Sequence, residues 1–562
     1  MTPSLLGWPA GLPEVLDAAM DTAAASAGLF GPARSAELDA GEEFPTAECE
    51  VLDRCGIARA YVPAELGGLP GGLPELLQSL RTVARRDVTV AVAHGKTFLG
   101  SVSTWVAGSD EQRRALARLV VEEDAVVAWG LTEPERGSDL LAGRLTAVAE
   151  EDGGWRLDGV KWPINNATRG RLVSVLARTS PQGGTRGFSL FLVDKSRLGT
   201  DGWQPLPKEP THGIRGADIS GIRFDDVAVA PEALTGRVGD GLETVLRALQ
   251  LTRTVCTSLS LGAGEHAFRL ARDFAAERVM YGTHLIELPL ARRVLGRAGA
   301  ALVLADAASL MAVRSAHCLT GEMSVVSALA KAGVPDIVQQ TIDELAEFLG
   351  ARGFLRTHHA HGMFQKLERD HRIVAIFDGS TAVNRSALIA QFLVLERMAR
   401  SGRHDEEGLA AARDTATLPT LDTAALRLLS RTGCSVVQGL PATARRLGEL
   451  TATGALPARA HELADALADE IASVARAMAG RRPVGQGVPA EDFATARRYE
   501  LCFAGASAAH LLLAAPGGGT RATHLMAALE RALELLRPGH EAPPEAYDRL
   551  LAPPAAAKEL VP

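Results

Sequence analysis

The sequence predicts a mostly α-helical protein with a central β domain, because the spacing of its apolar residues changes twice along the chain. Before about residue 124, apolar residues recur at helical spacing, as at Leu77, Leu80 and Val83. Short runs of β-branched and apolar residues follow between residues 125 and 231, and helical spacing returns after Gly241. Because no helices separate the predicted strands, a doubly wound dinucleotide fold is excluded.

We expect four segments from these changes. They are an N-terminal helical domain (1–124), a β domain (125–235), a helical bundle (236–400) and a helical C-terminal extension (401–562). Within the β domain the clearest strand candidates are residues 172–177 and 188–193. The extension begins with a charged linker at residues 403–407, and its amphipathic helices carry nearly balanced charge.

Composition narrows the class of protein. The chain has 562 residues, a net charge of −8 and six scattered cysteines. Its apolar runs fall short of the roughly 18 residues that span a bilayer, and its first ten residues lack the pattern of a signal peptide. We therefore expect a cytoplasmic protein with reduced thiols and no stable membrane insertion. Without a basic block, we expect no nucleic-acid partner.

One loop carries a specific pattern. Residues 132–139 read TEPERGSD, which by itself describes a strand followed by a Pro-Gly turn. The segment resembles the T-E-P-x-x-G-S-D loop of the acyl-CoA dehydrogenase family. Further matches occur in the family's order over about residues 50–396. They are residues 61–68 (YVPAELGG), 108–113 (GSDEQR), 159–161 (GVK), 164–167 (INNA) and 224–231 (FDDVAVAP).

The resemblance implies the family's fold and an FAD cofactor. Thr132 would hydrogen-bond the flavin ring, and Ser138 would lie near the cofactor pyrophosphate or the bound thioester. The family's W-I-T/S turn is here Pro163-Ile164-Asn165, so the aromatic residue beside the flavin is missing. Asn165 would supply a hydrogen bond in that turn.

Two further segments resemble cofactor contacts of the family. Residues 278–282 (RVMYG) are similar to R-x-x-F-G, which assigns Arg278 and Tyr281 to the FAD of a neighbouring subunit. Arginine suits this role because its planar donors match phosphate oxygens. Residues 348–354 (FLGARGF) are similar to a Gly-rich turn on the adenine side, where Gly350 permits close approach. Glu347 stands where a neutral glutamine is common.

The catalytic segment is the most informative. Residues 369–370 (RD) are followed by an apolar stretch and by residues 378–381 (DGST), where the family has E-G-T. By resemblance Asp378 removes the substrate α-proton, Arg253 and Gly379 contact the substrate, and Ser380 contacts the cofactor. Read alone, the same residues form a good Asx turn. Relatives that place the base elsewhere have glutamate at the position of Thr252.

Removal of an α-proton from a thioester requires a carboxylate base and hydrogen-bond donors to the thioester carbonyl. A thioester α-proton is poorly acidic, so donors must stabilise the developing enolate and a desolvated carboxylate must lie within about 3 Å of the proton. In the family a flavin ribityl hydroxyl and the backbone N–H of the catalytic residue hold the carbonyl. That N–H would here belong to Asp378. The flavin then accepts hydride from the β-carbon.

The aspartate leaves several reactions open. Its side chain is about 1.5 Å shorter in reach than glutamate, and displacements of that order can cost about a hundredfold in rate. The first expectation is dehydrogenation of an acyl thioester on CoA or an acyl-carrier protein, with an electron-transfer flavoprotein as a candidate electron acceptor. The alternatives are redox-neutral isomerisation or cyclisation, nitroalkane-type oxidation, and, more remotely, a DNA-binding flavoprotein.

Two other features complete the expectations. His358, His359 and His361 do not share one helical face, so no metal site is predicted there. The extension resembles that of very-long-chain enzymes, in which extra helices replace one dimer of the tetramer. A homodimer is therefore expected.

Overall fold

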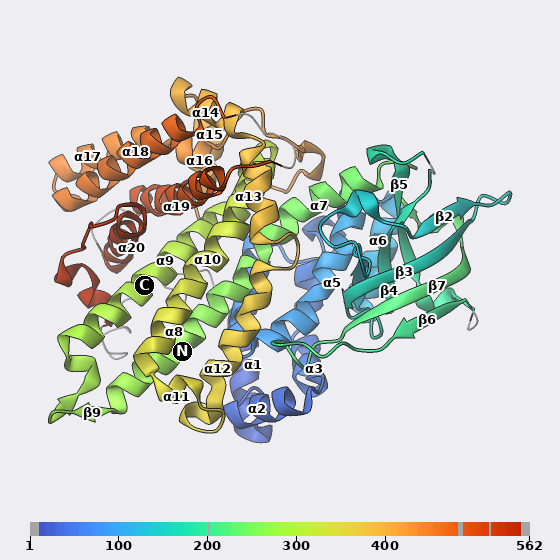
Figure 1. The fold of residues 1–562 in the computed structure, drawn as a ribbon, viewed down its shortest axis with the longest axis horizontal. Coiled ribbons are helices and arrows are strands. Elements are labelled where there is room, and N and C mark those ends of the chain that lie inside the picture. Colours follow the sequence, from blue (N-terminus) through green and yellow to red (C-terminus); the bar gives the residue numbers. More distant parts are fainter. Residues whose placement is uncertain (1–10, 181, 200–201, 482–486, 516–518, 552–562) are drawn as a thin grey trace. The chain divides into compact units, whose positions relative to one another are not determined.

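The computed structural model describes residues 11–180, 182–199, 202–481, 487–515 and 519–551 (Figure 1). Its contacts divide the chain into two compact units, Gly11–Thr252 and a unit that runs from Arg253 onward. The division falls near the end of α7 (Gly241–Val255). The four segments predicted from the sequence are finer than these units and stay a prediction.

The first unit begins with helices. They are α1 (Leu12–Ala27), α2 (Pro32–Gly41), α3 (Thr46–Arg54), α4 (Gly72–Ala84), α5 (Val88–Ala107) and α6 (Asp110–Glu122). Asp87 begins α5 by accepting the N–H of Thr89 at 2.8 Å. Ser109 and Gln112 begin α6 with a reciprocal capping box, which satisfies two donors of the first turn.

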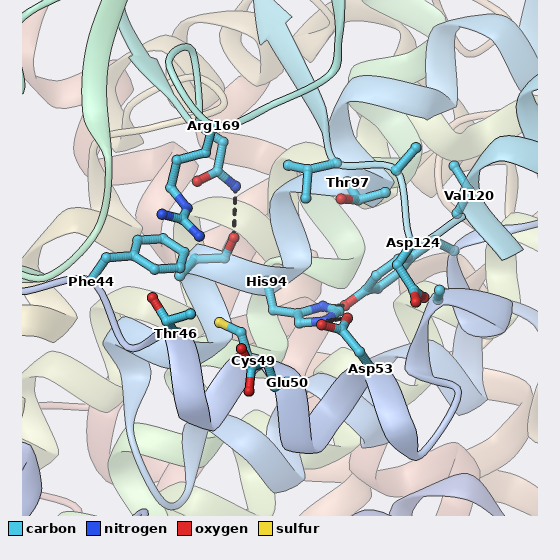
Figure 2. A pocket seen from close by; sticks show the side chains of 16 residues that line it. Phe44, Thr46, Cys49, Glu50, Asp53, His94, Thr97, Val120, Asp124 and Arg169 are labelled. Carbon is cyan, nitrogen blue, oxygen red and sulfur yellow. Dashed lines mark hydrogen bonds and ion pairs between the residues drawn. The ribbon is translucent and has the colours of Figure 1, made fainter. Parts of the chain in front are cut away.

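A cavity of about 220 Å³ lies among these helices (Figure 2). Residues of α3, of α5 and of the segment after α6 line it, together with Asn166 and Arg169 from the turn that follows β3.

An eight-stranded sheet completes the first unit. Its strands are β1 (Val127–Gly130), β2 (Thr146–Ala149), β3 (Trp155–Asn165), β4 (Leu172–Arg178), β5 (Phe188–Asp194), β6 (Trp203–Leu206), β7 (Ile219–Val229) and β8 (Leu234–Thr235). The order is β6-β7-β3-β2-β4-β5-β8, and β1 pairs in parallel with β4. The two strands predicted most clearly are β4 and β5, which pair antiparallel.

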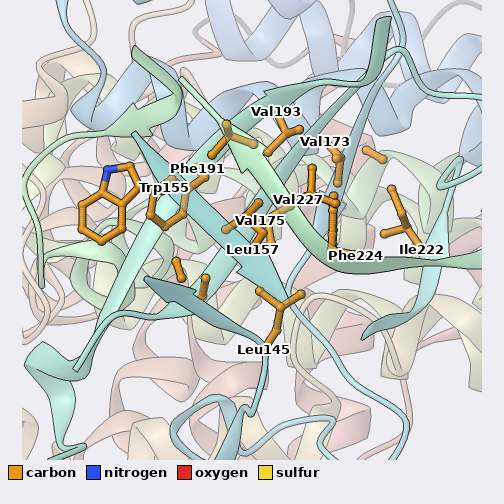
Figure 3. Packing of buried hydrophobic residues seen from close by; sticks show 14 of the residues in the cluster. Leu145, Trp155, Leu157, Val173, Val175, Phe191, Val193, Ile222, Phe224 and Val227 are labelled. Carbon is orange, nitrogen blue, oxygen red and sulfur yellow. The ribbon is translucent and has the colours of Figure 1, made fainter. Parts of the chain in front are cut away.

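The inward side chains of the sheet form an apolar core (Figure 3). Leu157, Phe191 and Phe224 are fully buried, and the Trp155 ring meets Phe191 edge-to-face with centroids 5.3 Å apart. Helix α5 packs closely on β1, because a Cβ at Gly100 would lie 2.4 Å from the carbonyl oxygen of Val127. This packing fixes the strand that leads into the loop at residues 132–139.

The second unit is built around long helices. They are α8 (Thr257–Glu277), α9 (Pro289–Cys318), α10 (Met323–Leu349), α11 (Ala351–Phe354), α12 (His359–His371), α13 (Thr381–Ile389) and α14 (Phe392–Ser401). A short hairpin of β9 (Val279–Met280) and β10 (Thr283–His284) follows α8. Within the described residues, α9 is long and apolar enough to span a membrane, but 89% of its apolar window is buried among its neighbours. It is therefore a core helix of the bundle.

The C-terminal helices pack on the bundle within the same unit (Figure 1). They are α15 (Glu406–Arg413), α16 (Ser435–Gln438), α17 (Leu440–Ala452), α18 (Ala458–Met478), α19 (Ala490–Leu513) and α20 (Thr520–Leu536). Helix α19 packs on α9, α10 and α13, and α20 packs on α9. A Cβ at Gly333 of α10 would lie 3.1 Å from the Cβ of Glu500, so the glycine permits this close approach. The fold-class prediction is confirmed.

Candidate active site

The loop that carries Asp378 joins η9 (Arg372–Ala375) to α13, and two cations hold it. Lys331 of α10 is fully buried, and its Nζ donates to the carbonyl oxygens of Val374 at 2.6 Å and Phe377 at 2.7 Å. Arg253 Nε donates to the carbonyl oxygen of Asp378 at 3.0 Å. Burial lowers the pKa of Lys331 to about 8 and lowers that of Arg253 from its usual value.

The start of α13 holds the other side of the loop. Ser380 begins the helix, and its Oγ accepts the N–H of Val383 at 3.3 Å. Asn384 Nδ2 donates to the carbonyl oxygens of Gly379 at 2.8 Å and Ser380 at 3.0 Å. Side chains from α7, α10 and α13 therefore fix successive carbonyl groups of the loop, which makes it a rigid support for Asp378.

The conformation of Asp378 suits its residue type. Its φ is 54°, in the left-handed region that Asp and Asn tolerate better than most residues. Cys256 Sγ donates to Asp378 Oδ2 at 3.5 Å. Within the described part of the chain, the Asp378 N–H has no hydrogen-bond acceptor. The loop thus presents a half-buried carboxylate and an unpaired backbone donor from the same residue.

Replacing Gly379 with alanine should disturb this arrangement. The residue has a φ of 89°, and an added Cβ would lie 2.9 Å from Arg253 Nη2. Strain and the displacement of Arg253 should lower the free energy of unfolding by about 1–3 kcal/mol and also lower turnover. Urea unfolding and steady-state kinetics measure both effects.

Gly402→Ala is the matched control. Gly402 also has a positive φ, 64°, but a Cβ added there would have no neighbouring atom within 4 Å. We expect this variant to lose stability without losing turnover. If Gly379→Ala turned over as fast as Gly402→Ala, the Arg253 contact would have no role in the site.

The histidine at the end of α12 is buried and uncharged. His371, at the end of α12, is buried between Gln339 Oε1, 2.8 Å from its Nδ1, and Ser260 Oγ, 2.9 Å from its Nε2. Burial, with the positive charges of Arg372 and Lys331, lowers the pKa of His371 to about 3. The folded protein therefore keeps this ring uncharged at neutral and mildly acidic pH.

His371 should make the fold acid-sensitive. Between pH 6.5 and about 3 the unfolded chain binds a proton at this ring that the folded protein does not, so stability falls as pH falls. At about 1.4 kcal/mol per pH unit, His371 alone should remove about 2 kcal/mol between pH 6.5 and 5. Urea unfolding across this range should show a shallower loss for His371→Gln than for the exposed-site control His284→Gln. Equal slopes would contradict the prediction.

Four predicted cofactor residues lie at another end of the bundle. Arg278 and Tyr281 follow α8, and Tyr281 is 91% exposed. Glu347 and Gly350 lie at the end of α10, about 24 and 28 Å along the helix from Lys331. The rings of Phe274 and Phe348, with centroids 6.4 Å apart, join the two segments. These residues are therefore brought together with one another, and not with Asp378.

Three predicted residues lie in the first unit. Thr132 Oγ1 donates to the Pro163 carbonyl at 3.2 Å, and Asn165 Nδ2 donates to the Val92 carbonyl at 3.0 Å. Ser138 lies in the exposed turn that follows β1. Thr132, in the loop after β1, thus bonds to β3 two residues before the strand ends at Asn165.

Two buried polar atoms in the described part of this unit lack hydrogen-bond partners, and the polar groups of a flavin ring would supply such partners. Within the described residues, Asn165 Oδ1 and Trp129 Nε1 are buried without hydrogen-bond partners. Such groups are rare in native proteins unless a ligand or water satisfies them. An unpaired acceptor on Asn165 suits an N–H group of a flavin ring, and by the resemblance Thr132 and Asn165 are the residues that would hold it.

A buried ion pair in the motif loop was missed from the sequence. Lys161 Nζ lies 2.9 Å from Glu133 Oε1, and Glu133 also accepts the N–H groups of Arg144 and Leu145. Burial lowers the pKa of Lys161. Burial would raise the pKa of Glu133, but Lys161 and the backbone donors lower it overall. The pair anchors the loop at residues 132–139. The sequence feature that could have revealed it is that Lys161 stands between apolar residues within a strand.

His358, His359 and His361 lie at the start of α12. His359 and His361 have left-handed backbone angles at a kink in α12. Among the described residues, no three His, Cys, Asp or Glu side chains are placed to hold a metal ion.

Family models and curated relatives match the chain over much of its length. Residues 128–227 match the model of the acyl-CoA dehydrogenase middle domain, and residues 239–393 match that of the C-terminal domain. The chain is 28% identical over 367 residues to the human mitochondrial short-chain specific acyl-CoA dehydrogenase, covering 64% of this chain and 85% of that protein. It is 26% identical over 353 residues to a probable acyl-CoA dehydrogenase of Mycobacterium leprae, covering 62% and 88%.

Solved structures share the fold. Butyryl-CoA dehydrogenase from Megasphaera elsdenii superposes with a TM-score of 0.60 at 24% identity, covering 67% of this chain and 96% of that one. The prolyl acyl carrier protein oxidase AnaB superposes with a TM-score of 0.61 at 20% identity, covering 69% and 100%. The family models end at residue 393, before the C-terminal extension.

Proposed function

This chain is an enzyme of the acyl-CoA dehydrogenase family, whose cofactor is FAD, and from that premise we propose that Asp378 removes the α-proton of an acyl thioester. When bound, FAD supplies the acceptor for the β-hydride, so that the product is an α,β-unsaturated thioester. The observation that carries the proposal is the fixed loop that presents both a carboxylate and an unpaired N–H from Asp378.

Each residue of the loop has a distinct part. The Asp378 carboxylate accepts the α-proton, and the N–H of the same residue donates to the thioester carbonyl as negative charge develops there. Arg253 and Lys331 hold the carbonyl groups of Asp378 and Phe377, so neither backbone group has to reorganise during the reaction. Cys256 positions the carboxylate through its Sγ–H.

The acyl carrier is CoA or the phosphopantetheine arm of an acyl-carrier protein. The named curated relatives support a CoA ester, because they are described as acyl-CoA dehydrogenases. AnaB supports a carrier protein, because it is described as a prolyl acyl carrier protein oxidase and has the same fold. We propose an electron-transfer flavoprotein as the electron acceptor for the CoA case.

The C-terminal extension should limit assembly to a homodimer. Helices α19 and α20 already pack on α9 and α10, which removes those helix faces from contact with another subunit. Light scattering should then give about 118 kDa, twice the 59.1 kDa of one chain. A mass near four chains would contradict this expectation.

The direct test is anaerobic mixing of the purified FAD-containing protein with acyl-CoA and acyl-carrier thioesters. Flavin absorbance and product mass are followed together. Loss of absorbance with loss of two hydrogens from the substrate supports dehydrogenation. Turnover with unchanged absorbance would instead establish redox-neutral α-proton chemistry, and loss of absorbance with nitroalkanes alone would establish nitroalkane-type oxidation.

A further inference from the structure

None of the residues assigned above to the thioester or the cofactor lines the cavity among α3, α5 and the segment after α6, although Asn166 of its wall directly follows Asn165 (Figure 2). It is contained within the first unit, and its volume of about 220 Å³ suits a small molecule. Figure 2 shows Asp53, His94 and Asp124 gathered on one side, with Arg169 and Phe44 on the other.

One wall of the cavity is a hydrogen-bonded chain of three side chains. His94 Nε2 lies 2.8 Å from Asp53 Oδ1, and His94 Nδ1 lies 2.7 Å from the Tyr61 hydroxyl. A carboxylate only accepts, so Nε2–H donates to Asp53 and, in the neutral ring, Nδ1 accepts the Tyr61 proton. Both ring nitrogens are therefore occupied, and the chain offers a ligand only acceptor oxygens.

A buried acceptor points to a missing donor. Asn166 is 1% exposed and lines the cavity. Its Nδ2 donates to the Ala93 carbonyl at 2.7 Å, but within the described residues its Oδ1 has no partner. Buried polar atoms of native proteins are nearly always paired, so a ligand with N–H groups would complete this site.

The charges around the cavity favour a cation. Glu50, Asp53 and Asp124 line it, against the single guanidinium of Arg169, which stacks on the Phe44 ring at 3.7 Å. Partial burial and the negative charge of Asp53 raise the pKa of Asp124. Because no three metal-ligating side chains converge among the described residues, a metal ion does not fit this distribution.

We propose that this cavity binds a small organic cation with a primary ammonium or guanidinium group, whose N–H groups donate to Asn166 Oδ1 and to the carboxylates of Asp53 and Asp124. Several donors on one cation match acceptors that are spread along a wall, whereas a metal ion needs them at one point. Arg169 narrows the other side and limits the size of the ligand.

Calorimetric titration of the full-length FAD-containing protein tests the proposal. The probes are propylammonium and agmatine, at constant ionic strength and pH 7.5. Saturable binding of at least one probe is expected. Tetramethylammonium has the same charge and no N–H donor, so its affinity should be at least about tenfold weaker.

Variants locate the site. Asp124→Asn is the first, because asparagine tolerates the left-handed backbone at this position (φ 48°). Asp53→Asn is the second, and its amide oxygen still accepts from His94. Each should weaken probe binding about tenfold, while Glu151→Gln, an equal charge change at an exposed turn, should leave it unchanged. Absence of saturable binding, or equal losses in all three variants, would overturn the proposal.

Discussion

Asp378→Asn should lower turnover by about 10²- to 10⁴-fold, the usual contribution of a positioned general base. The amide has nearly the same shape, tolerates the left-handed backbone and cannot accept the α-proton. The variant should therefore fold, bind FAD and bind the thioester with little change. Stopped-flow absorbance of the flavin measures the rate of the reductive step.

A second readout separates proton removal from binding. Exchange of the substrate α-proton with deuterated water, followed by NMR, should be lost in Asp378→Asn and retained in Cys256→Ala at a reduced rate, because Cys256 only positions the carboxylate. Exchange at the wild-type rate in Asp378→Asn would falsify the assignment of the base.

Glu500→Leu should lower the free energy of unfolding by about 1–3 kcal/mol, because Arg385 loses its most buried anionic partner and keeps only its contact with Asp336. Glu500 of α19 is 2% exposed, and its Oε1 and Oε2 accept from Arg385 of α13 at 2.9 and 2.8 Å. Burial raises the pKa of Glu500 to about 7 even though Arg385 lowers it. Urea unfolding at pH 8 measures the loss with the carboxylate charged.

Glu500→Leu should also disturb the loop that carries Asp378. Arg385 follows Asn384, which holds the carbonyl groups of Gly379 and Ser380. Loss of the Glu500 contact should therefore also lower turnover.

Two controls test this explanation. Arg400→Ala, which removes an exposed guanidinium from its pair with the part-buried Glu396, should cost no more than about 1 kcal/mol. Arg385→Met combined with Glu500→Leu should recover part of the stability, because Arg385 no longer has to stay half-buried with Asp336 as its remaining anionic partner. A Glu500→Leu variant as stable as Arg400→Ala would show that the extension does not depend on this pair.

The sequence by itself determined the fold class and the family, and it singled out the loop at Asp378 as the candidate site. These properties follow from local sequence patterns. Hydrophobic spacing distinguishes helix from strand, and residues 132–139 and 378–381 are contiguous motifs. The strands at 172–177 and 188–193 were predicted for the same reason, since alternation and turn residues are local signals.

Only the tertiary structure decided what holds those motifs in place. Arg253 reaches the carbonyl of Asp378 across 125 residues, Lys331 reaches that of Phe377 across 46, and Lys161 pairs with Glu133 across 28. The chain from Asp53 through His94 to Tyr61 likewise joins separate helices. No local pattern marks such partners, because a buried polar side chain is stable only once packing brings its counterpart within hydrogen-bond distance.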